Sequence, residues 1–147
     1  IKGAGIMTYQ CKKAVVSLIS NVIVFFILFN KLNVLANGDS QVWGKFFLYL
    51  LGVMVATNIV VTLVFNIIHN TFSKYTAPIT QDERDQTIEL KSVRNFCFLL
   101  SFGFFVSMAA LAFQQPITTM FAVMAMTVLA ASIALYASYI FYYQRGY

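Results

Sequence analysis

The chain has 147 residues, of which 60% are hydrophobic and only 10% are charged, and its formal net charge is +5. Soluble domains are about 45–50% apolar and about 25% charged, so this sequence has too few charges for the surface of a soluble domain. The same numbers exclude a disordered chain, and two cysteines are too few for a disulfide scaffold. We therefore expect an all-α membrane protein whose residues 1–147 form a single transmembrane domain.

Charge-free stretches predict four transmembrane helices, since a helix needs about 20 apolar residues to cross the hydrocarbon core. The expected spans cover approximately residues 14–33, 45–69, 94–113 and 117–143. The last two share an uncharged run of 50 residues, which Gln114-Gln115-Pro116 divides, because proline starts a helix more readily than it continues one. The expected fold is two helical hairpins, with a cytoplasmic charged helix at residues 79–93 running into the third span.

Lysine and arginine predict the orientation of these spans, because cytoplasmic loops carry an excess of both. With the N-terminus inside, eight of the ten lie on the inner side and only Lys31 and Lys45 lie outside. Both termini are therefore expected in the cytoplasm, with Trp43 and Phe46 as anchors at the outer interface. The alternative for the first span is a cleavable signal peptide ending near Val34-Leu35-Ala36.

Four of the five acidic residues fall within residues 82–89. Asp82, Asp85 and Glu89 share one face of the expected helix, and Arg84, Ile88, Lys91 and Asn95 form a separate stripe. Three interpretations stay open: a solvated helix beside the membrane, a divalent-cation site on the three carboxylates, and a partner-binding surface. The partner-binding surface would comprise Asp82, Glu83, Arg84, Asp85, Glu89 and Lys91.

The run DERDQTIELKSVRN resembles an element of a family of small, uncharacterised prokaryotic four-helix integral membrane proteins, in which a D-E-R-D-x-x-I-x-x-K motif joins two transmembrane hairpins. The opening TYQCKKAVVSLIS is similar to the N-terminus of that group. The resemblance implies a bacterial cytoplasmic (inner) membrane protein and brings no established activity with it.

A polar stripe follows the second span, with Asn58, Thr62, Asn66 and Asn70 spaced four residues apart. Asparagine in hydrocarbon needs a hydrogen-bond partner, and Ser17 and Asn21 of the first span have the same spacing. The stripe is therefore either a set of interhelical hydrogen bonds or a polar path or small ligand pocket through the bundle.

Small residues four apart allow helices to approach closely. Such pairs occur at Gly52 and Ala56, at Gly103 and Ser107, and along Ala130, Ala134 and Ser138. The sequence leaves open whether these faces pack within the chain or between chains, and we expect a homo-oligomer or a subunit of a larger membrane complex.

The sequence offers no catalytic, cofactor or metal-binding motif. His69 is the only histidine, and Cys11 and Cys97 lack any paired spacing. No Asp, Glu, Lys or Arg lies within an expected span, which argues against a proton-coupled antiporter. The positive charge fits anionic lipid and requires no nucleic acid.

These observations predict a protein that is not an enzyme. The leading expectation is a regulatory, accessory or assembly subunit that acts through its charged helix. The alternative is a channel or facilitator for a small polar solute or ion, lined by the Asn and Thr residues of the second span.

Overall fold

The computed structural model describes residues 9–32, 39–72 and 83–145, which form four α-helices. These are α1 (Tyr9–Lys31), α3 (Ser40–Phe72), α4 (Glu83–Ala112) and α5 (Ile117–Arg145). Each is long and apolar enough to cross a membrane. The fold is therefore all-α, and it is that of a multi-pass membrane protein.

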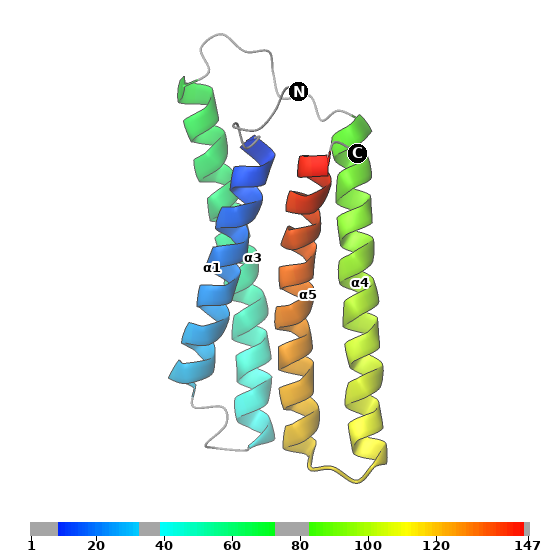
Figure 1. Cartoon of the computed structure of the whole chain (residues 1–147). Coiled ribbons are helices and arrows are strands. Elements are labelled where there is room, and N and C mark those ends of the chain that lie inside the picture. Colours follow the sequence, from blue (N-terminus) through cyan, green and yellow to red (C-terminus); the bar gives the residue numbers. More distant parts are fainter. Residues whose placement is uncertain (1–8, 33–38, 73–82, 146–147) are drawn as a thin grey trace.

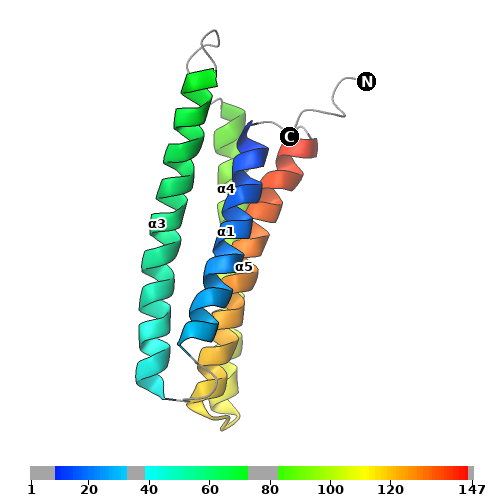
Figure 2. The same ribbon diagram turned by 90° about the vertical axis from the view of Figure 1, so that its left-hand side faces the viewer.

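The four helices run side by side, each antiparallel to the next one along the chain (Figure 1). α1 packs against both α3 and α5, whereas α4 packs chiefly against α5. Figure 2 shows α3 at one edge of the bundle. We call the end where α1 and α4 begin the charged end; it includes Lys12, Lys13, Asp85, Glu89, Lys91 and Arg145.

All four helices extend beyond the expected spans at one end or both. α3 begins at Ser40 rather than at residue 45, because Asp39 caps it: the Gln41 amide donates to Asp39 Oδ1 at 3.4 Å. α4 is unbroken from Glu83, so the described part of the expected 79–93 helix and the third span form one helix. Residues 79–82, with Asp82, lie outside the described residues.

The turn between α4 and α5 lies where Gln114-Gln115-Pro116 predicts it. The Gln115 amide donates to the Ala110 carbonyl and the Gln114 amide to the Leu111 carbonyl, which is the Schellman pattern of a helix end. Gln114 has a φ of 58°, a left-handed conformation usually taken by glycine. Proline at 116 then precedes the first residue of α5, Ile117.

An aromatic cluster lies at the opposite end of the bundle from the charged end. Its rings come from α1, α3 and α5: Phe25, Phe29, Trp43, Phe46, Phe47 and Phe121. The expected placement of Trp43 and Phe46 as interfacial anchors is wrong, since they are 1% and 0% exposed. Trp43 stacks on Phe121 with ring centroids 5.9 Å apart. Both residues pack inside the helix bundle rather than against lipid headgroups.

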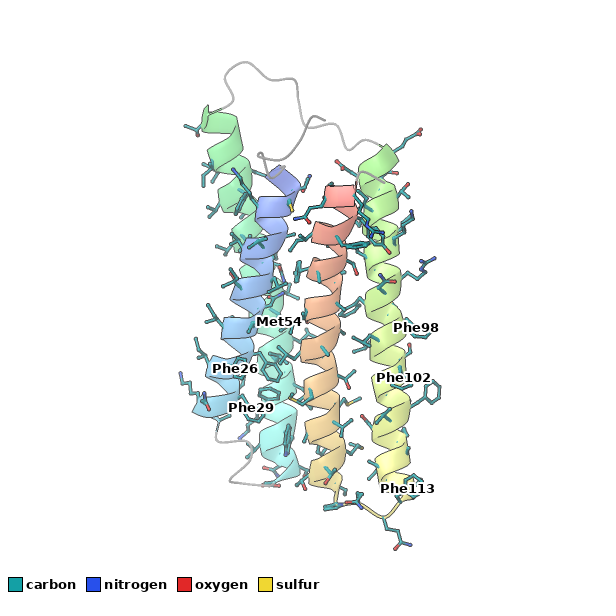
Figure 3. The ribbon with its side chains drawn as sticks, in the orientation of Figure 1. Phe26, Phe29, Met54, Phe98, Phe102 and Phe113 are labelled. Carbon is teal, nitrogen blue, oxygen red and sulfur yellow. The ribbon has the colours of Figure 1, made fainter. Side chains whose placement is uncertain are left out.

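Large apolar side chains cover the outer faces of α3 and α4. Figure 3 shows Phe98 and Phe102 pointing away from the neighbouring helix, and Phe98 is 76% exposed. In a membrane these faces contact acyl chains, so their exposure carries no penalty.

Two of the faces with small residues four apart differ in burial: one packs against another helix and the other is exposed. Gly103 and Ser107 are buried against α5, and a Cβ added at Gly103 would overlap the side chain of Thr127. Gly52 and Ala56 are exposed, and a Cβ at Gly52 would meet nothing within 4 Å. The first pair therefore packs within the chain, and the second pair faces away from it.

Candidate functional site

A three-residue polar cluster joins α1, α3 and α5 inside the bundle. Tyr136 donates its hydroxyl hydrogen to Asn58 Oδ1 at 2.8 Å, and Asn21 Nδ2 donates to the Tyr136 hydroxyl at 3.1 Å. Asn58 Nδ2 donates to Asn21 Oδ1 at 3.4 Å and to the Met54 carbonyl at 2.9 Å. The expected contact between Asn58 and the first span is present at Asn21. Tyr136 is a member of the cluster that the sequence did not identify.

A cavity of about 320 Å³ lies between this polar cluster and the charged end. All four helices contribute to its wall, and the deepest lining residues on α1, α3 and α5 are Ser17, Asn58 and Leu135. Small-molecule pockets span about 300–1,000 Å³, so this cavity suits a small ligand. Beyond it lie the buried Asn21 and then Phe25 of the aromatic cluster.

Two carboxylates and one ammonium group line the same cavity. Asp85 and Glu89 lie one helical turn apart on α4, and Lys13 contributes from α1. The acidic face expected on this helix therefore turns toward a basic residue, as the repulsion between its carboxylates requires. Counting one positive and two negative side chains, the described wall carries one excess negative charge.

Three tyrosines at spacings of three and four residues form the α5 wall: Tyr136, Tyr139 and Tyr143. The rings of Tyr136 and Tyr139 lie 6.4 Å apart between centroids. Tyr143 donates its hydroxyl hydrogen to Asp85 Oδ1 at 3.0 Å, which ties α5 to α4 at the charged end. The cavity thus combines carboxylates with aromatic surface.

The second stripe of α4 packs on α5. Ile88 is buried, Lys91 Nζ lies 5.7 Å from the centroid of the Tyr142 ring, and Asn95 Nδ2 donates to Ser138 Oγ at 3.0 Å. These contacts give a structural reason for the spacing of Asp85, Ile88 and Lys91 in the D-E-R-D-x-x-I-x-x-K run.

The remaining predicted site residues differ in their relation to the cavity. Thr62 lines the cavity, whereas Asn66 and Glu83 are exposed and do not line it. The side chains of Arg84 and Asn70 are outside the described residues, as is the whole of Asp82. Among its described side chains, the stripe of the second span therefore lines the cavity at Asn58 and Thr62 alone.

Metal binding by the described residues finds no support, because no group of three His, Cys, Asp or Glu side chains is placed to hold an ion among them. Asp85 and Glu89 alone offer fewer oxygens than the six to eight that calcium takes. The three-carboxylate site considered from the sequence also depends on Asp82, which is not described.

The tyrosine wall was not identified from the sequence. The spacing of Tyr136, Tyr139 and Tyr143 is a signal for one helix face that could have identified them. Sequence reasoning also placed Asp85 and Glu89 outside the spans, which led to the argument against a titratable solute path. In the structure both residues line the cavity at the charged end.

The fold and cavity define the class of protein: a four-helix membrane protein with a polar cavity between its helices. No family model, curated protein or solved structure matches the chain.

Proposed function

We propose that this protein binds a small polar solute in the four-helix cavity and facilitates its movement across the membrane. The observation that carries the proposal is the cavity itself, because it joins Asp85 and Glu89 at the charged end to Asn58 within the bundle. Hydrogen-bonding groups inside an apolar bundle are costly unless they serve packing or a ligand. Here they border a space large enough for a ligand, and the proposal requires no catalytic reaction.

The proposed orientation places the charged end in the cytoplasm of a bacterium, in the inner membrane. The excess of lysine and arginine at this end supports it, as does the resemblance of the 82–95 segment to prokaryotic membrane proteins. The helices would then form two hairpins, and the first turns of α4 would project into the cytoplasm. In this orientation the cavity opens toward cytoplasmic solute, and the aromatic cluster blocks the outward side.

Reconstituted liposomes test the proposal by their rate of swelling in gradients of glycerol, urea and methylammonium chloride. We expect at least one solute to enter faster than into protein-free liposomes. Thr62→Phe should slow that entry, because the larger ring fills the cavity without removing a member of the polar cluster.

Asn66→Leu is the matched control, one turn further along α3 and outside the cavity wall. It should leave the swelling rate unchanged. Swelling at the protein-free rate for all three solutes, or equal rates for Thr62→Phe and the unaltered chain, would reject the proposal.

A second candidate function is a regulatory, accessory or assembly subunit of a membrane complex, including a homo-oligomer. The open space above Gly52, together with the exposure of Ala56, favours it because another helix could pack closely there. Photo-crosslinking from Ala56 and from Glu83 in native membranes tests this candidate. Recovery of the monomer alone would reject it.

A further inference from the structure

We propose that the ligand of this cavity is a small organic cation, a primary or quaternary ammonium compound. The inference rests on the proposed function and names the class of solute. The structure places two carboxylates, three tyrosine rings and a polar floor around one space of about 320 Å³. The carboxylates and the tyrosine rings favour a positive charge, and the rings also favour an apolar body that carries it.

The charge of the wall selects a cation. Asp85 and Glu89 outnumber Lys13 among the described lining residues, which leaves one negative charge there for a monovalent ligand to balance. Asp85 is held in place by the hydrogen bond from Tyr143, so one carboxylate is already oriented. An anion would meet both carboxylates with only one ammonium group in compensation.

The aromatic surface selects an organic cation over an inorganic one. Tyrosine faces attract ammonium groups through the ring quadrupole. Leu135 and Ala14 add apolar surface to the same wall. A potassium or sodium ion would exchange its water shell for these surfaces at a loss, whereas alkyl groups on nitrogen would pack against them.

The polar floor fits the same ligand class. The amides of Asn21 and Asn58 and the hydroxyl of Tyr136 are engaged with one another. They leave a neutral surface below the carboxylates rather than a second charged site. A ligand with one charged end and a neutral polar or alkyl end therefore matches the cavity from its mouth to its floor.

The experiment measures binding of three cations to the purified full chain: methylammonium, tetramethylammonium and choline. Isothermal titration is carried out in an uncharged maltoside detergent, because lipid headgroups that contain ammonium groups could bind at the same site. The comparison ligand is 3,3-dimethyl-1-butanol, which has the shape of choline with carbon in place of the charged nitrogen. We expect choline to bind at least about tenfold more tightly than this neutral isostere.

Variants connect the binding to the cavity. Asp85→Asn and Glu89→Gln should each weaken choline binding about three- to tenfold, and Asp85→Asn retains an acceptor for Tyr143. Lys13→Gln should tighten it, because the repulsive charge is removed. Glu83→Gln is the matched control, since Glu83 is exposed on the same helix and does not line the cavity.

Tyr139 tests the aromatic part of the site. Tyr139→Phe keeps a ring and should retain choline affinity, whereas Tyr139→Leu should lower it by about fivefold or more. Equal loss in both variants would contradict the role of the ring face.

The inference is overturned if none of the three cations binds, or if the neutral isostere binds as tightly as choline. It is also overturned if Glu83→Gln weakens binding as much as Glu89→Gln, or if potassium chloride displaces choline at equal concentration. Swelling with glycerol or urea that persists in any of these cases would preserve the proposed function and remove only the cation selectivity. Loss of both cation binding and solute entry would remove both.

Discussion

The hydroxyl of Tyr136 on α5 donates its hydrogen to Oδ1 of Asn58 on α3, 2.8 Å away, although the two helices have few other close contacts. The same oxygen of Tyr136 accepts a hydrogen from Asn21 on α1. One phenol therefore links three helices at the floor of the cavity. Removing the Tyr136 hydroxyl should therefore lower the stability of the bundle and change the shape of the cavity floor.

Tyr136→Phe should lower the free energy of unfolding by about 1–2 kcal/mol, because Asn21 and Asn58 each lose a partner inside the bundle. Thermal unfolding in detergent, followed by near-ultraviolet circular dichroism, measures the effect. Tyr142→Phe is the matched control, since it keeps the ring that Lys91 approaches. Equal unfolding temperatures for Tyr136→Phe and the unaltered chain would contradict the structural role of the cluster.

Gly103→Ala should destabilise the chain by about 1–3 kcal/mol, because the added Cβ overlaps the side chain of Thr127 between α4 and α5. Gly52→Ala should be neutral or stabilising, because it meets open space and alanine favours the helix. The same unfolding assay compares the two. Adding Thr127→Ala to Gly103→Ala should recover part of the lost stability. A double variant that is no more stable than Gly103→Ala would argue against the contact between Gly103 and Thr127.

Leu50→Ala should cost about 2–5 kcal/mol, because Leu50 is 2% exposed beside the aromatic cluster and its loss leaves a cavity. Leu48→Ala, at a side chain 72% exposed on the same helix, should have a small effect on unfolding in detergent. Similar losses at the two positions would mean that the face of α3 turned toward the bundle is assigned wrongly.

Gln114→Gly should stabilise the chain by about 1 kcal/mol, because glycine adopts the φ of 58° without the steric penalty of a side chain. Gln115→Gly serves as the comparison in the same turn and should bring no such gain. A lower unfolding temperature for Gln114→Gly would contradict the Schellman geometry of this helix end.

Much of the fold could be predicted from local features of the chain. The four helices follow from apolar runs of membrane-spanning length, and the α4–α5 turn follows from proline at 116, because both effects depend on neighbouring residues only. The start of α3 depends on a cap outside the apolar run: the second span is expected from residue 45, and α3 begins at Ser40, next to Asp39. Contacts between Asn58 and α1 could be expected, because an amide in an apolar helix needs a partner.

The site could be predicted only in part. Asn58 and Thr62 were identified by their spacing, whereas Asp85 and Glu89 were assigned to a surface of the cytoplasmic helix and Tyr139 was not identified. Their common cavity depends on how α4 and α1 lie around α5, which is a relation between segments far apart in the chain. The spacing of residues along a helix shows which side chains share a face. It does not show which other helix packs against that face.

The sequence by itself determined the class of this protein, the number of long apolar helices in the described residues and the asymmetry of its charges. Only the tertiary structure decided which apolar residues are buried, for example Trp43 and Leu50, and which face outward, for example Phe98. The physical reason is that lipid is as apolar as a protein interior, so a membrane helix lacks the polar face by which a soluble helix reveals its orientation. For the same reason the cavity could not be predicted from the sequence, because its wall depends on how α1, α3, α4 and α5 pack against one another.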